Sequence, residues 1–134
     1  KAVPALMTIL MSAYKHLEEN VLLRDITFKV AETFTEESNF KDGEFWYDEL
    51  LKIDQTDSEA FWGKVKCETK CANDFEIHQK FGGNKSERKQ RQLTQLQSYI
   101  NAKNSATDEQ YDRYLRIFAT DFAANTAKEK KAKK

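Results

Sequence analysis

The chain has 134 residues, a length that suits one domain built around one hydrophobic core. Its 22 basic and 22 acidic residues balance, so no overall electric field favours nucleic acid or an anionic membrane as a partner. No apolar run approaches the roughly eighteen residues that are needed to span a bilayer. With one proline and four glycines in a chain rich in good helix formers, the composition predicts an all-α fold.

The N-terminal part of the chain is predicted to form two helices. From Pro4 to Leu17 apolar residues recur every three or four positions, which is the period of an amphipathic helix. Asn20 is expected to end this first helix. A second helix is expected to begin near Asp25 and to end before the polar run at 36–39.

Two further helices are predicted in the middle of the chain. The series at 40–53 is too rich in apolar residues for a narrow stripe, so it predicts a helix that is packed on two sides. The polar run at 54–58 ends it. Either Asp57 or Ser58 is expected to cap the next helix, because both side chains can accept a hydrogen bond from the free amides of a first turn. That helix extends to about Cys71.

The C-terminal part is predicted to contain a pair of helices. The run Gly-Gly-Asn at 82–84 is the strongest turn signal in the chain, and Ser86 is expected to open a fifth helix that closes at 101–105. Thr107 followed by Gln110 is typical of a capping box, which predicts the start of a sixth helix.

The predicted organisation is a single helical domain over residues 1–126. The tail at 127–134 contains only alanine, lysine and one glutamate, and this composition predicts a disordered, lysine-rich segment.

A pattern of large and small residues runs through the segment 24–57 and into the next helix. The residues that carry it are Val30, Ala31, Phe34, Phe40, Gly43, Tyr47, Leu50 and, beyond the elbow, Phe61. This pattern resembles the tetratricopeptide repeat, and the resemblance covers about Arg24 to Cys71. The segment departs from the family pattern at Thr27, Gln55 and Lys64, where the family has Trp, Pro and Leu. A helical bundle with a chance similarity is the alternative.

The resemblance implies stacked helical hairpins, which form a fragment of an α-solenoid. The C-terminal pair of helices is expected to diverge from this repeat pattern. It also implies a non-catalytic scaffold that binds a protein or peptide along the groove of the stacked helices. Independently of the family, paired helices cannot bury both of their faces alone, so they stack and leave an extended groove. Gly43 is expected to allow a close contact with the paired helix.

The candidate residues for partner binding are Trp46 and Trp62. They belong to the densest aromatic group of the chain, which also contains Phe45, Tyr47 and Phe61. These rings cannot all fit one contact between two helices, so most are assigned to the core and one or two to the surface. An exposed tryptophan beside a groove is a favourable anchor, because it buries a large area at little entropic cost.

Basic residues are dense between Lys64 and Arg91, which suggests an alternative function as a nucleic-acid-binding accessory protein. The candidate patch consists of Lys64, Lys66, Lys70, Lys85, Arg88, Lys89 and Arg91. Only Phe75 and Phe81 are interleaved there as stacking partners for bases, and the formal net charge is zero. A solvated face is therefore the preferred interpretation, and the expected partner is a protein or peptide.

Cys67, Cys71 and His78 raise a second alternative, a small thiol or zinc protein. A structural zinc site usually has four ligands, and the other histidine, His16, is distant in the sequence. The preferred interpretation makes Cys67 a buried hydrophobe, Cys71 a helix-end residue and His78 a solvated loop residue. We therefore expect no metal, no cofactor and no catalytic site. So few cysteines indicate a reducing cytoplasm rather than a secreted disulfide scaffold.

Overall fold

The computed structural model describes residues 2–120 and residue 122, and their side chains from residue 5 onward. These residues form seven α-helices and one short 3-10 helix, with no strand among them, so the all-α prediction is confirmed for this part of the chain. The predicted disordered tail at 127–134 lies outside the described residues.

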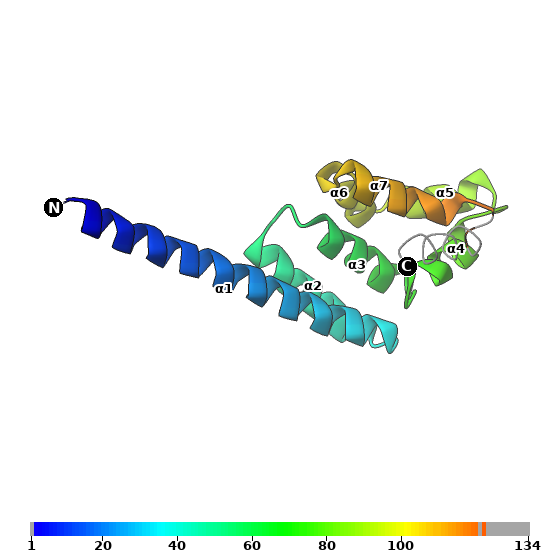
Figure 1. The fold of residues 1–134 in the computed structure, drawn as a ribbon. Coiled ribbons are helices and arrows are strands. Elements are labelled where there is room, and N and C mark those ends of the chain that lie inside the picture. Colours follow the sequence, from blue (N-terminus) through cyan, green and yellow to red (C-terminus); the bar gives the residue numbers. More distant parts are fainter. Residues whose placement is uncertain (1, 121, 123–134) are drawn as a thin grey trace, which may run out of the picture.

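Helix α1 (Ala2–Glu36) is one continuous helix of 35 residues and is the longest element in Figure 1. The prediction that Asn20 ends a first helix is therefore wrong. A single asparagine inside a helix costs only a few tenths of a kcal/mol, and neither proline nor glycine follows it to break the backbone pattern. The apolar residues Val21, Leu22 and Leu23 continue the helix into its second half.

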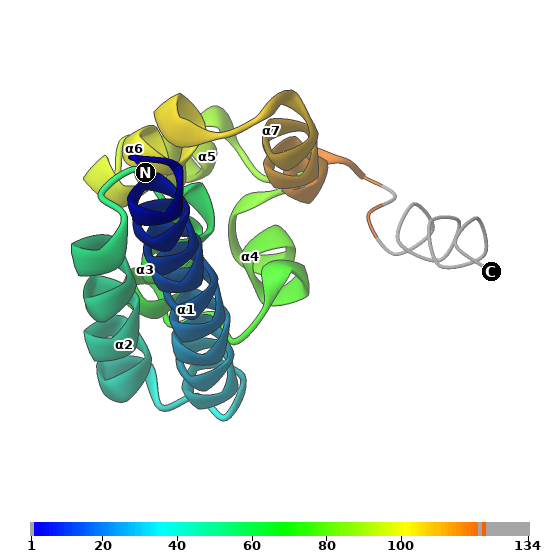
Figure 2. The ribbon, with the colours of Figure 1, turned by 60° about the vertical axis from the view of Figure 1, so that its left-hand side comes forward.

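Helix α2 (Phe40–Ile53) has the predicted boundaries and runs back along the C-terminal half of α1 (Figures 1 and 2). Helix α3 (Ser58–Thr69) follows a short elbow. Asp57 is its cap, since the carboxylate accepts a hydrogen bond from the amide of Ala60 at 3.2 Å. Ser58, the other predicted cap, donates instead to the carbonyl of Ala102 at 2.7 Å.

The C-terminal part contains four short helices: α4 (Asp74–Phe81), α5 (Glu87–Thr94), α6 (Gln97–Ser105) and α7 (Asp108–Leu115), followed by the 3-10 helix η1 (Arg116–Phe118). The predicted capping box of Thr107 and Gln110 is confirmed at the start of α7. The predicted pair of helices is wrong, because the expected fifth helix breaks at Gln95 and Leu96 into α5 and α6.

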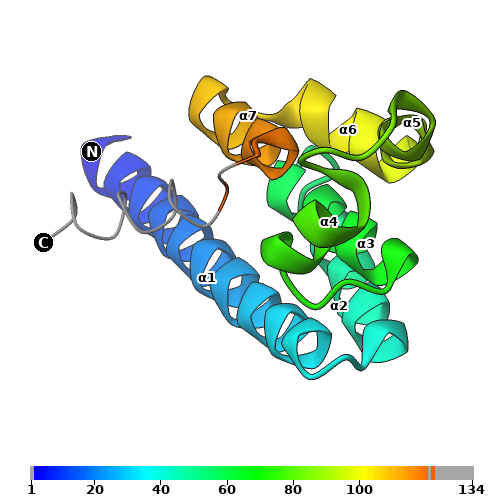
Figure 3. The ribbon, with the colours of Figure 1, turned by 90° about the vertical axis from the view of Figure 1, so that its right-hand side faces the viewer.

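Helix α3 separates two hydrophobic clusters, and α2 lies on the opposite side of it from α6 (Figures 1 and 3). The first cluster joins α1, α2 and α3 and consists of Ala31, Tyr47, Leu50, Ala60 and Cys67. The second joins α3 to the C-terminal helices and consists of Trp62, Val65, Cys71, Ile77, Phe81, Leu93, Tyr99, Ala102, Tyr114 and Ile117. Helix α3 is thus the central element of the fold.

Gly43 and Gly63 lie at the tightest helix contacts. A Cβ atom on Gly43 would lie 2.5 Å from Oγ1 of Thr35 and 3.1 Å from Sγ of Cys67, which confirms the close contact expected at this position. A Cβ atom on Gly63 would enter the ring of Tyr47. Both glycines therefore allow α2 to approach its neighbours more closely than any larger residue permits.

Candidate functional site

The part of α1 that precedes Arg24 exposes a large apolar surface. Its large apolar side chains are between 51% and 67% exposed, and they are Leu6, Met7, Ile9, Leu10, Met11, Tyr14, Leu17, Val21, Leu22 and Leu23. Figure 1 shows this part of the helix extending well beyond the end of α2. A helix that is apolar around most of its circumference is normally buried, and monomeric proteins rarely expose so large a contiguous patch.

Part of this surface forms a line that continues the interface between α1 and α2. We define the α1 seam as five residues at intervals of three and four: Met7, Leu10, Tyr14, Leu17 and Val21. Such intervals keep side chains along one side of a helix. The same spacing continues through Arg24 to Phe28 and Ala31, which pack in the first cluster. The α1 seam is therefore the uncovered extension of a face that α2 covers.

Arg24 marks the point where the covered part begins. Its guanidinium donates to both carboxylate oxygens of Asp57, with Nε to Oδ2 at 2.9 Å and Nη2 to Oδ1 at 3.1 Å. It also lies 4.7 Å from the ring centroid of Phe28. The hydrogen bonds with Asp57 raise the pKa of the Arg24 guanidinium above its ordinary value. These contacts fix α1 to the elbow between α2 and α3.

The two candidate anchors lie in different environments. Trp62 is only 3% exposed, its ring stacks on Tyr114 at a centroid distance of 4.4 Å, and its Nε1 donates to Asp74 at 2.8 Å. The expectation of an exposed anchor at Trp62 is corrected: this residue belongs to the core. Trp46 is half-buried, and the neighbouring ring of Phe45 is 55% exposed. A role for Trp46 in binding stays a prediction.

The predicted basic patch is divided between α3, the segment that follows α4, and α5. Lys64 forms an ion pair with Asp48 at 2.9 Å, and Lys66 lies 4.0 Å from Asp74. The ammonium of Lys89 lies 5.5 Å from the ring centroid of Phe81. These contacts engage three of the seven cations within the protein. The interpretation of this segment as a solvated face stays a prediction.

The two cysteines and His78 lie in three different environments. Cys67 packs in the first cluster, with Sγ 3.5 Å from Oγ1 of Thr35, whereas Cys71 packs in the second. Burial raises the pKa of both thiols, so both are neutral near pH 7. His78 is not the predicted loop residue: it lies on α4, and its Nδ1 is 2.7 Å from the carbonyl of Ile117. Within the described part of the chain no group of three His, Cys, Asp or Glu residues is arranged to hold a metal ion.

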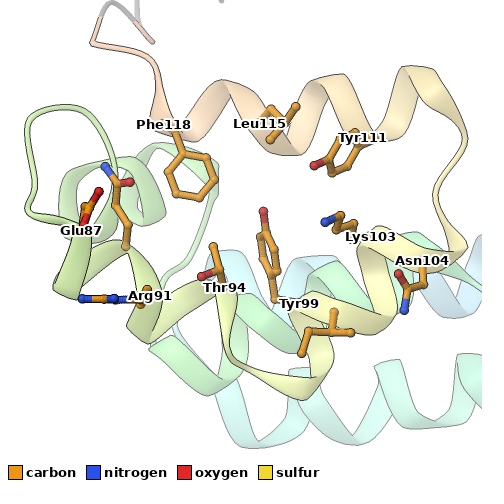
Figure 4. Close-up of a pocket in the computed structure, with 11 residues that line it drawn as sticks. Glu87, Arg91, Thr94, Tyr99, Lys103, Asn104, Tyr111, Leu115 and Phe118 are labelled. Atoms are coloured by element: carbon orange, nitrogen blue, oxygen red, sulfur yellow. The ribbon is translucent and has the colours of Figure 1, made fainter.

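A cleft of about 580 Å³ lies between α5, α6, α7 and η1 (Figure 4). Tyr99 stands at its centre, and Lys103 and Tyr111 lie beside it. The sequence pattern did not indicate this cleft, since the expected single helix from Ser86 would have kept α5 and α6 in line. The break at Gln95 and Leu96 is the feature that creates it. No side chain supplies a capping hydrogen bond at Leu96, so the sequence carries no strong signal for the break.

Comparisons with known proteins give no relative from which a function can be transferred. No protein-family model, no curated protein and no solved structure matches the chain. In the described residues, no helix combines the length and the apolar character that crossing a bilayer requires.

Proposed function

We propose that the protein is a non-catalytic interaction scaffold, and that the α1 seam binds a helix of a partner protein. The observation that carries the proposal is the continuity of one apolar line along α1, buried under α2 at one end and exposed at the other. The partner helix would lie in line with α2 and would present its own apolar residues at intervals of three and four.

The amount of apolar surface is sufficient for such a complex. Burying a fully exposed large apolar side chain contributes about 1.5 to 3 kcal/mol. The five residues of the α1 seam are 51% to 67% exposed, so together they contribute roughly 4 to 9 kcal/mol. Association costs about 4 to 15 kcal/mol in lost freedom of motion. The two free energies are of similar size, which supports reversible binding. Contacts of the partner with Leu6 or Met11 would strengthen the binding.

The arrangement of α1, α2 and α3 supports a scaffold of the tetratricopeptide kind. The three helices pack in succession, and Gly43 lies where the resemblance requires a small residue. Beyond α3 the chain departs from the stacking of successive helices, because the side of α3 away from α2 packs more extensively against α6 than against the next helix, α4. The buried neutral thiols of Cys67 and Cys71 are compatible with a reducing, cytoplasmic setting.

The experiment places a photo-crosslinking amino acid, p-benzoylphenylalanine, at position 14 in the source cell. We expect an adduct in which the crosslinked segment of the partner is a helix with apolar residues every three or four positions. Sedimentation of the purified chain shows whether a second copy is that partner. Absence of any adduct at position 14, or adducts only with non-helical segments, contradicts the proposal.

A further inference from the structure

We propose that the cleft between α5, α6 and α7 binds an apolar carboxylate, and that the source of this carboxylate is the C-terminal residue of a peptide. The cleft lies among the C-terminal helices, and none of its lining residues belongs to α1. This site is therefore separate from the α1 seam, and the two proposals stand or fall independently.

The hydroxyl of Tyr99 is a hydrogen-bond donor that has no acceptor in the described part of the protein. The side chain is only 6% exposed, and Figure 4 shows its oxygen pointing into the cleft. Burial raises the pKa of Tyr99 to about 12, so the group keeps its proton at neutral pH. A buried side chain normally places its polar group against a partner, and a ligand in the cleft can provide an acceptor for this hydroxyl by displacing water.

A cationic group, the ammonium of Lys103, faces the same space. The ammonium of Lys103 lies 5.8 Å from the ring centroid of Tyr111, and in Figure 4 it points towards the oxygen of Tyr99. Arg91 and Glu87 line the far end of the cleft, where Figure 4 shows the guanidinium of Arg91 directed away from Tyr99. No carboxylate of the described residues forms an ion pair with Arg91 or Lys103.

The charge balance of the cleft selects the kind of anion. Lys103 supplies a single positive charge beside Tyr99, which matches a carboxylate better than a doubly charged phosphate. Tyr99 and Lys103 can each donate a charge-assisted hydrogen bond to a carboxylate, and such bonds are stronger than neutral ones.

The walls of the cleft select an apolar group beside that anion. Ile100 and Leu115 are 37% and 39% exposed, and Phe118 also lines the cleft. The volume of about 580 Å³ lies within the range of small-ligand sites, roughly 300 to 1,000 Å³. A C-terminal residue with a branched or aromatic side chain supplies both the carboxylate and the apolar group.

The test is a calorimetric titration of the purified chain with three probes: N-acetyl-alanyl-leucine, its C-terminal amide, and 4-methylpentanoate. We expect the peptide acid to saturate the protein and the amide to bind at least about tenfold more weakly, because the amide lacks the charge. We also expect 4-methylpentanoate to bind more weakly than the peptide acid. Equal or tighter binding of 4-methylpentanoate overturns the assignment to a peptide.

Two variants locate the binding site. Lys103→Met and Tyr99→Phe should each weaken binding of the peptide acid about tenfold. Lys41→Met on α2 makes the same change of charge outside the cleft and should bind like the wild type. Tyr99→Phe should melt like the wild type, because its hydroxyl has no internal partner to lose. Equal affinities for acid and amide, wild-type affinity in both cleft variants, or no saturation overturn the proposal.

Discussion

The two halves of α1 have the same spacing of apolar residues but lie in different environments. From Arg24 onward the helix packs against α2, and Ala31 is completely buried. Before Arg24 the same line continues, yet Leu10 and Leu17 are each 60% exposed. The comparison teaches that a periodic apolar pattern defines a contact face of a helix, whereas the neighbouring elements decide whether that face is covered within the chain.

The largest expected effect lies on the covered side of the molecule, at Trp62. Trp62→Ala removes a buried ring and its hydrogen bond to Asp74, and we expect it to lower the free energy of unfolding by about 3 to 5 kcal/mol. The half-buried Trp46 is the matched comparison, and Trp46→Ala should cost only about 1 to 2 kcal/mol. Urea denaturation of both variants measures the difference. Equal losses would contradict the assignment of Trp62 to the core.

A smaller loss is expected where α2 meets its neighbours. Gly43→Leu forces a side chain against Thr35 and Cys67, and we expect it to destabilise the protein by about 1 to 3 kcal/mol through overpacking. Lys41→Leu, on an exposed position of the same helix, is the control. Thermal melting distinguishes the two. An unchanged melting temperature for Gly43→Leu would show that the contact between α2 and its neighbours is wrongly placed.

The boundary between the two halves of α1 tests how firmly the helix is held. Asp57→Ala removes both the cap of α3 and the ion pair with Arg24, so we expect a loss of about 1 to 2 kcal/mol. Arg24→Met keeps the cap but removes the ion pairs with Asp57 and Glu59 and the contact of the guanidinium with Phe28, and it should cost less, roughly 1 kcal/mol. A double-mutant cycle by urea denaturation gives the coupling between them. A coupling of zero would mean that the ion pair contributes nothing to stability.

The smallest effect on stability is expected on the exposed half of α1. The double substitution Leu10→Glu and Leu17→Glu changes two exposed side chains, so its free energy of unfolding should stay within about 0.5 kcal/mol of the wild type. Ser12→Glu, on the opposite side of the helix, is the control for added charge. Urea denaturation that shows a loss of several kcal/mol only in the double variant would mean that another part of the chain covers the α1 seam.

Much of the fold was predictable where local signals are strong. The boundaries of α2, the cap region of α3 and the capping box of α7 depend on side chains within a few residues of each helix end, so the sequence predicts them. The continuity of α1 was missed because Asn20 is a weak breaker. The break between α5 and α6 was missed because Leu96 makes no capping hydrogen bond and instead packs against the second hydrophobic cluster.

The candidate site was less predictable than the helix boundaries, because it depends on contacts between residues that lie far apart in the sequence. The expectation that Trp62 is exposed was wrong, because its ring stacks on Tyr114, which lies far away in the sequence. Periodicity alone cannot show such a contact. The apolar residues between Leu6 and Val21 were visible in the sequence, but their exposure depends on how far α2 extends along α1. The cleft around Tyr99 depends on the unexpected bend before α6.

The central claim is that the exposed half of α1 binds a partner and is not required for the fold. The most direct test is the yield of the crosslinked adduct from position 14, measured for the double variant Leu10→Glu, Leu17→Glu and for Ser12→Glu. We predict that the double variant loses most of the adduct while it folds normally, and that Ser12→Glu keeps it. Equal yields in the two proteins would contradict the claim, because charges placed on the α1 seam would then leave the contact intact.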